Sequence, residues 1–155
     1  MARKSTPPGR ALPGSGARLR LPRVLVVDDV ADNREMYMDY LKFAGFSVLG
    51  AVDGGTAIEA ARSHHPAVIV MDLSMPGVDG CGATRVLKED PATRDILIFA
   101  VTGHAEASYR EQAALAGCDL FIPKPCSPRE LVEHICRHLD LALPDDSRSP
   151  ASSKR

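Results

Sequence analysis

Five short apolar runs, each followed by a segment of helical periodicity, constrain the fold of this chain more than any other feature. The apolar residues in these runs are largely consecutive, which is typical of strands buried on both faces of a sheet. Parallel strands need long crossover connections, which are usually helices with a right-handed path. The sequence therefore predicts a doubly wound α/β fold, in which helices cover both faces of a five-stranded parallel sheet. The predicted strands are residues 24–27, 46–51, 67–71, 96–101 and 119–122.

Signals for helix starts and stops stand between the predicted strands. Asp32, with Glu35 three residues later, predicts a capping box for the first helix. Ser127 predicts the N-cap of the last helix, with Pro128 at its first position and Glu130 completing a capping box. The predicted helices are residues 33–44, a short helix capped by Asp53, residues 83–88, residues 105–116 before Gly117, and the segment after Ser127.

The charge distribution divides the 155-residue chain into three parts. Residues 1–23 contain six basic residues and no acidic ones, whereas residues 24–143 contain 10 basic and 18 acidic residues. Residues 1–23 and 144–155 are rich in Pro, Ser, Gly or Ala without periodicity, so we expect both tails to be disordered. The folded domain is therefore predicted to cover residues 24–143.

Several functional classes are disfavoured by composition. No apolar run approaches the ~20 residues of a membrane span, and no signal-peptide core follows the basic tail, which predicts a cytoplasmic protein. The basic tail lacks interleaved aromatic residues, so nucleic-acid binding is not expected. Zinc binding by Cys126, His134, Cys136 and His138 is improbable, because Cys136 lies on a different helix face from the two histidines.

Polar residues follow four of the predicted strands. Asp28 and Asp29 follow the first, Asp72 the third, Thr102 the fourth and Lys124 the fifth. The carboxyl ends of parallel strands meet at one edge of the sheet, where ligands of such folds bind. Three carboxylates there would repel one another without a cation, which favours a hard metal such as Mg²⁺. A lysine and a hydroxyl suit a phosphoryl group, so the pattern predicts a phosphoryl-transfer site.

Four motifs stand at these strand ends, namely VLVVDD at 24–29, VMDLSMPGVDG at 70–80, VTGH at 101–104 and FIPKP at 121–125. Together they resemble the receiver domain of two-component (phosphorelay) response regulators, across residues 24–143. The spacings from Asp29 to Asp72, from Asp72 to Thr102 and from Thr102 to Lys124 are 43, 30 and 22 residues. Motifs in this order at these strand ends are jointly specific, although an acidic pair alone is not. The resemblance implies a flavodoxin-like sheet in the order 2-1-3-4-5.

The resemblance also implies a chemical role for the acidic residues. Asp72 would accept a phosphoryl group from a histidine kinase or a histidine phosphotransfer protein. Asp29, Asp72 and the backbone carbonyl of Ser74 would bind Mg²⁺ directly, and Asp28 would act mainly through water. The chain would be phosphorylated and would slowly dephosphorylate itself, but it would not be an enzyme that turns over a separate substrate.

Further residues would bind the phosphoryl group and transmit its presence. Lys124 would pair with the group, Thr102 would move to hydrogen-bond it, and Phe121 would move inward into the space that Thr102 leaves. The resemblance also implies a cis peptide bond before Pro125. The surface formed by the fourth helix, the fifth strand and the fifth helix would then bind a downstream protein or a second copy of the domain.

Two residues of the same motifs would tune the lifetime of the phosphorylated state. Ser74 and His104 lie two residues after Asp72 and Thr102, and in receivers these positions flank the path of the attacking water. Nothing after Leu143 has the length of an output domain, so we expect a stand-alone receiver or one excised from a longer protein.

Two alternative functions remain open at this point. A Mg²⁺-dependent phosphatase with an aspartate nucleophile usually has a second acid two residues after that nucleophile, where this chain has Ser74. A receiver-like interaction module that is never phosphorylated would be favoured by the loss of a site residue, but the carboxylates, Thr102 and Lys124 are all present.

Overall fold

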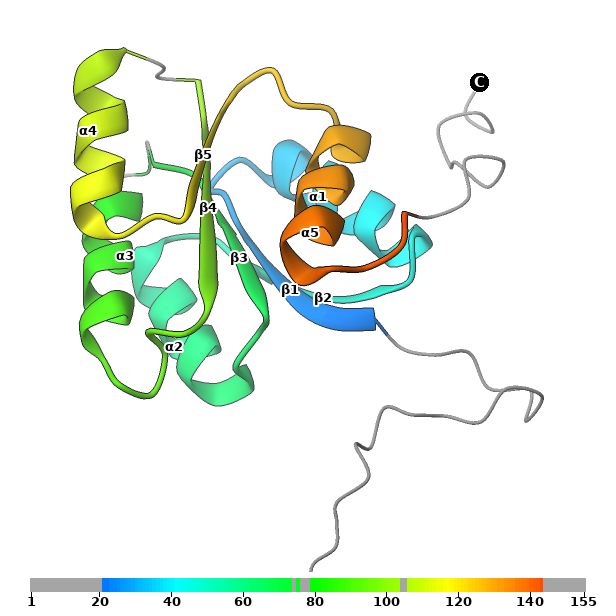
Figure 1. The fold of residues 1–155 in the computed structure, drawn as a ribbon, viewed down its shortest axis with the longest axis horizontal. Helices are drawn as coiled ribbons and strands as arrows, with labels where there is room; N and C mark the ends of the chain where they lie inside the picture. Colours follow the sequence, from blue (N-terminus) through cyan, green and yellow to red (C-terminus); the bar gives the residue numbers. More distant parts are fainter. Residues whose placement is uncertain (1–20, 74, 76–78, 104–105, 144–155) are drawn as a thin grey trace, which may run out of the picture.

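The computed structural model describes residues 21–73, 75, 79–103 and 106–143. Strands and helices alternate along the chain (Figure 1). The strands are β1 (Leu21–Val27), β2 (Phe46–Ala51), β3 (Val68–Met71), β4 (Leu97–Thr102) and β5 (Leu120–Pro123). The helices are α1 (Ala31–Phe43), α2 (Gly54–His64), α3 (Gly80–Glu89), α4 (Ala107–Ala116) and α5 (Pro128–Leu139).

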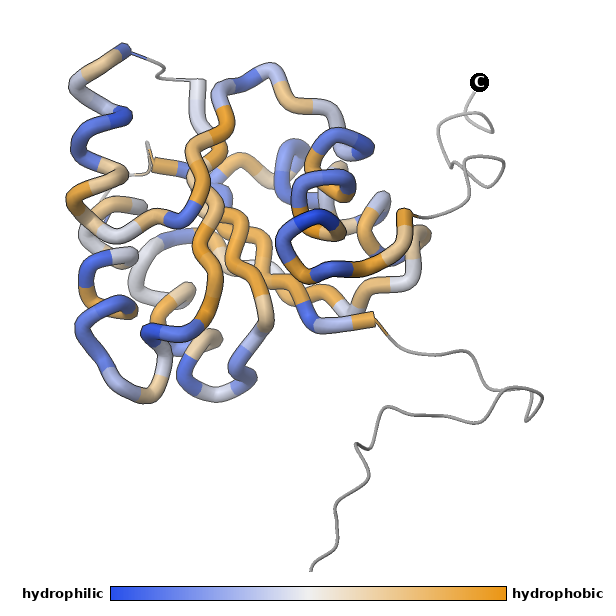
Figure 2. The backbone as a smooth tube through the Cα atoms, in the orientation of Figure 1, coloured by the Kyte–Doolittle hydropathy of each residue, from blue (hydrophilic) through white to orange (hydrophobic). Residues whose placement is uncertain are grey.

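All five strands are parallel and lie in the order β2-β1-β3-β4-β5, which confirms the predicted sheet. Helices α1 and α5 cover one face, and α2, α3 and α4 cover the other (Figure 1). Alternate residues of β1 point to opposite faces, so Leu25 and Val27 pack towards α2–α4, whereas Val24 and Val26 pack towards α1 and α5. Figure 2 shows the hydrophobic strands running between the two helical layers.

The start of the domain differs from the prediction. β1 begins at Leu21 and not at residue 24, because Leu21 pairs with Phe46 at the start of β2. Residues 21–23 therefore belong to the sheet, and the predicted basic tail is too long by three residues at its end. The rest of the two predicted tails lies outside the described residues. Within the described part of the chain, no helix has the length and apolar character needed to cross a membrane.

Of the two capping boxes predicted from Ser/Asp and Glu pairs, one is confirmed and one is wrong. In α5, Ser127 accepts a hydrogen bond from the Glu130 amide, and the Glu130 carboxylate accepts one from the Ser127 amide. Helix α1 instead begins at Ala31, with Val30 as an N-cap that has no side-chain bond. The Asp28 carboxylate accepts a hydrogen bond from the Val30 amide at 3.0 Å. A residue at the end of β1 therefore fixes the backbone just before α1.

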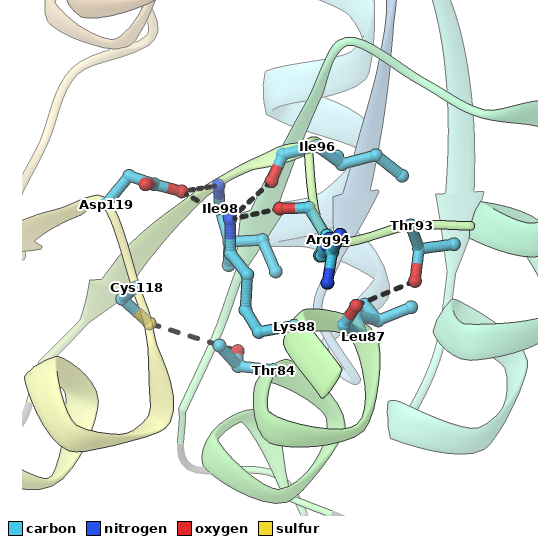
Figure 3. Close-up of polar contacts among 9 residues, drawn as sticks. All are labelled: Thr84, Leu87, Lys88, Thr93, Arg94, Ile96, Ile98, Cys118 and Asp119. Atoms are coloured by element: carbon cyan, nitrogen blue, oxygen red, sulfur yellow. Dashed lines mark hydrogen bonds and ion pairs between the residues drawn. The ribbon is translucent and has the colours of Figure 1, made fainter. Parts of the chain in front are cut away.

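A network around Lys88 ties the C-terminal end of α3 to the two strands beyond it (Figure 3). The Lys88 ammonium donates to the carbonyls of Arg94 and Ile96 at 3.1 and 2.8 Å, and to Asp119 at 3.0 Å. The same Asp119 oxygen accepts the Ile98 amide at 2.8 Å. The network joins α3, β4 and the segment before β5 at the edge of the sheet opposite the strand ends that carry the predicted site.

Replacing Lys88 with Met should destabilise the domain. The change keeps the apolar stem but leaves two carbonyls and a carboxylate without their charged donor, which should lower the free energy of unfolding by about 1 to 3 kcal/mol. Urea denaturation at neutral pH measures this change. Lys42→Met, at an exposed lysine in the last turn of α1, is the matched control and should leave the midpoint unchanged. Equal midpoints for the two variants would contradict the role given to Lys88.

Candidate functional site

Three aspartates meet at the carboxyl ends of β1 and β3. One carboxylate oxygen each from Asp28, Asp29 and Asp72 lies within 4.8 Å of the others. The register of the sheet causes this, because Val27 pairs with Met71 and the Asp72 amide donates to the Val27 carbonyl at 3.0 Å. The residues that follow the two strands are therefore neighbours, as the sequence predicts.

The chemistry of this acidic cluster suits a divalent cation. Asp28 and Asp72 are only 3% and 8% exposed, whereas Asp29 is exposed. Two buried carboxylates beside a third repel one another unless a positive charge lies among them. Carboxylate oxygens are the ligands that Mg²⁺ prefers. This ion usually keeps several bound waters. Water can reach the cluster from the side of the exposed Asp29. The three side chains thus fit the predicted metal.

Lys124 brings a positive charge to the same cluster. Its ammonium nitrogen lies 3.5 Å from an Asp28 oxygen. Its backbone amide donates to the Thr102 carbonyl at 2.8 Å, so the ends of β4 and β5 are joined beside the acidic residues. The Lys124–Pro125 peptide bond is cis, as expected. A small cavity of about 10 Å³ lies among these groups, and its lining includes Asp28, Asp72 and Lys124.

The chain is similar throughout residues 24–136 to the family model of the response regulator receiver domain. The chain belongs to the response regulator receiver family. The polar-differentiation response regulator DivK of Brucella ovis is 34% identical over 116 residues, which are 75% of this chain and 94% of DivK.

Solved structures of response regulators and receiver domains support the same family assignment for this chain. The receiver domain of sensor histidine kinase PA1611 from Pseudomonas aeruginosa, with a magnesium ion coordinated in its active-site cleft, superposes with a TM-score of 0.70. It is 29% identical, and the match covers 75% of this chain and 95% of that domain. Chemotaxis response regulator CheY4 of Vibrio cholerae, at 26% identity, gives a TM-score of 0.71 with 76% and 98% of the two chains covered.

The predicted switch residues of the receiver lie on one face of the sheet. Phe121 of β5 pairs with Ala100 of β4, and Thr102 is two residues further along β4, so both side chains point towards α2–α4. Thr102 is fully buried, and Phe121 is half-buried. The Arg110 guanidinium of α4 lies over the Phe121 ring, 4.7 Å from its centre. Sequence reasoning missed Arg110, because no local pattern pairs a helix residue with a ring on the next strand.

Two residues of α1 also support the site and were not predicted to do so. Arg34 donates to the Asp28 carbonyl at 2.8 Å, and Tyr37 donates from its hydroxyl to the Cys126 carbonyl at 2.6 Å. Tyr37 fits the apolar periodicity of α1, so the sequence indicates a core residue and gives no sign of its hydroxyl bond.

The remaining sequence predictions concern the two tuning positions and the zinc site. Ser74 and His104 lie outside the described residues. Within the described part of the chain, the one group of three or more potential ligand residues placed to share a metal ion is the aspartate cluster, which contains none of the residues weighed for zinc. The four cysteines are free thiols, and burial raises the pKa of Cys126 to about 11, so this thiol is protonated at neutral pH.

Replacing Asp29 with Asn should weaken Mg²⁺ binding and relieve repulsion in the metal-free protein. We expect the affinity to fall at least about tenfold, since even outer-shell partners of a metal site cost that much. Without Mg²⁺ the variant should be more stable than the parent, because one negative charge has left the cluster. Calorimetric Mg²⁺ titration and thermal unfolding measure the two effects. Asp32→Asn, in the first turn of α1, is the control, and equal Mg²⁺ affinity in Asp29→Asn and the parent would refute the assignment.

Proposed function

We propose that this receiver accepts a phosphoryl group on Asp72 from the phosphohistidine of a histidine kinase or histidine phosphotransfer protein, in a Mg²⁺-dependent reaction. The observation that supports this most directly is the meeting of Asp28, Asp29 and Asp72 within 4.8 Å, with Lys124 at 3.5 Å from Asp28.

In the proposed step, an oxygen of the Asp72 carboxylate forms a bond to phosphorus as the bond from phosphorus to the donor imidazole nitrogen breaks. The imidazole leaves with the electron pair of the broken bond, and Asp72 becomes an aspartyl phosphate. Asp28, Asp29, Asp72 and the Ser74 carbonyl would hold Mg²⁺, which neutralises the phosphoryl oxygens when bound. Lys124 turns from Asp28 to the transferred group and offsets its negative charge.

The signal would pass through Thr102 and Phe121. A phosphoryl oxygen on Asp72 gives the Thr102 hydroxyl a new acceptor, and Phe121 moves into the space that Thr102 leaves. This movement separates Phe121 from Arg110 and changes the surface of α4, β5 and α5. A downstream protein or a second copy of the domain binds that changed surface.

Three further points complete the proposal. The chain has no turnover of its own beyond phosphorylation and slow loss of the phosphoryl group. Ser74 and His104 stay the predicted tuning positions for that loss, and the cytoplasm stays the predicted location.

A phosphatase function is disfavoured because Ser74 stands where the second acid is usual. A module that is never phosphorylated is the outcome that the first experiment below would reveal.

Phosphorylation should be confined to Asp72. Incubation with acetyl phosphate and Mg²⁺ should add the mass of one phosphoryl group to the parent, and chelation of Mg²⁺ should prevent it. Asp72→Asn should stay folded and gain no mass, while Asp79→Asn, at the N-cap of α3, should still be labelled. Labelling of Asp72→Asn at the rate of the parent would contradict the assignment, and an unlabelled parent would favour the interaction module.

Thr102→Ala should separate phosphorylation from signalling. The variant keeps the carboxylates and Lys124, so we expect it to gain the phosphoryl group. It lacks the hydroxyl that moves, so phosphorylation should no longer change dimerisation or amide chemical shifts on α4, β5 and α5. Size-exclusion chromatography and NMR with and without phosphodonor measure this response. A response equal to that of the parent would mean that Thr102 does not couple Asp72 to Phe121.

A further inference from the structure

A buried tyrosine hydroxyl connects α1 to the segment that carries Lys124. Tyr37 is 4% exposed, and its hydroxyl donates to the carbonyl of Cys126, also 4% exposed, at 2.6 Å. A phenylalanine would fill the same apolar space without a hydroxyl that has to be removed from water. The hydroxyl is therefore the part of Tyr37 that needs an explanation beyond core packing.

The bond anchors the backbone two residues after Lys124. The backbone at Lys124 itself is held by a second hydrogen bond, from the Lys124 amide to the Thr102 carbonyl at 2.8 Å. Helix α5 begins directly afterwards, at Pro128. The backbone that bears the Lys124 side chain is thus held at two points, one on β4 and one on α1.

Tyr37 also borders the acidic cluster itself. It lines the small cavity together with Asp28, Asp72 and Lys124, and it lines a larger outer groove of about 570 Å³ that contains Lys124 and Pro125. Tyr37 and Lys124 are the two residues that line both spaces. Burial above all, and then nearby negative charge, raises the pKa of Tyr37 to about 12, which keeps the hydroxyl a neutral donor at physiological pH.

We propose that Tyr37 is a positioning residue for phosphoryl transfer, whose hydroxyl holds the Cys126 carbonyl and thereby keeps the Lys124 ammonium within reach of the group on Asp72. This inference rests on the function proposed above and adds a residue to it. The three aspartates come from the ends of β1 and β3 and do not depend on this anchor. The loss of the hydroxyl should therefore affect the transfer step more than Mg²⁺ binding.

The first test compares Tyr37→Phe with Tyr40→Phe, which removes a hydroxyl from a half-buried tyrosine three residues along the same helix. At saturating Mg²⁺, Tyr37→Phe should slow phosphorylation by acetyl phosphate about two- to tenfold, the range expected when one buried hydrogen bond is lost. Its Mg²⁺ affinity should stay within about twofold of the parent, because the Tyr37 hydroxyl bonds the Cys126 carbonyl and not one of the three aspartates, so it is not an outer-shell partner of the metal site. Tyr40→Phe should match the parent in both measurements, and an unchanged rate in Tyr37→Phe would overturn the inference.

The second test asks whether Tyr37 acts through Lys124. In a Lys124→Ala background, which has no ammonium to position, Tyr37→Phe should have no further effect on the rate. An equal slowing in both backgrounds would show a general structural role and would overturn the inference.

The third test needs no phosphorylation. Hydrogen exchange of the Lys124 amide, measured by NMR, should be faster in Tyr37→Phe than in Tyr40→Phe, because one of the two anchors of the segment is gone. Equal exchange rates would overturn the inference even if the parent is phosphorylated as proposed. A parent that gains no phosphoryl group would instead overturn the proposed function, and the exchange rates would still show whether the anchor exists.

Discussion

The parallel pairing of β1 with β3 is the constraint on which the rest of the site depends. Val27 opposes Met71, so the next residues of both strands, Asp28 and Asp72, must share one end of the sheet. Both carboxylates are buried, and their repulsion opposes the very pairing that brings them together. Lys124 at 3.5 Å from Asp28 offsets part of this repulsion, and a bound divalent cation would offset more.

The two faces of the sheet place different side chains around this cluster. Thr102 and Phe121 point towards α2–α4, where Arg110 covers the Phe121 ring. Tyr37 belongs to the core beneath α1 and α5, and its hydroxyl holds the chain just after Lys124. In the proposed reaction, the face with α1 and α5 would hold the segment that carries Lys124, and the face with α4 would supply Thr102 to bond the phosphoryl group and Phe121 to move in response.

The strands, their order and the strand-end residues were predictable because they follow from local patterns and from the family's motifs. The two errors have different causes. Leu21 joins β1 through its long-range pairing with Phe46. Asp32 makes no cap because α1 begins one residue earlier, at Ala31, and the Arg34 amide already donates to the Val30 carbonyl. The tyrosine bond spans 89 residues, and no helical or strand periodicity indicates a contact of that range.

Packing around Asp72 also limits where movement can occur. A Cβ on Gly80 would overlap the Asp72 carbonyl oxygen and the Leu73 Cα, so the start of α3 lies directly against the backbone of Asp72 and Leu73. At the opposite edge of the sheet, Lys88 holds the segments that lead into β4 and β5. With both of these places closely packed, a change at Asp72 has little room to spread through α3. Phe121 is half-buried and has the Arg110 guanidinium over its ring, so in the proposed switch it is the side chain placed to move, and the response would pass towards α4 and β5.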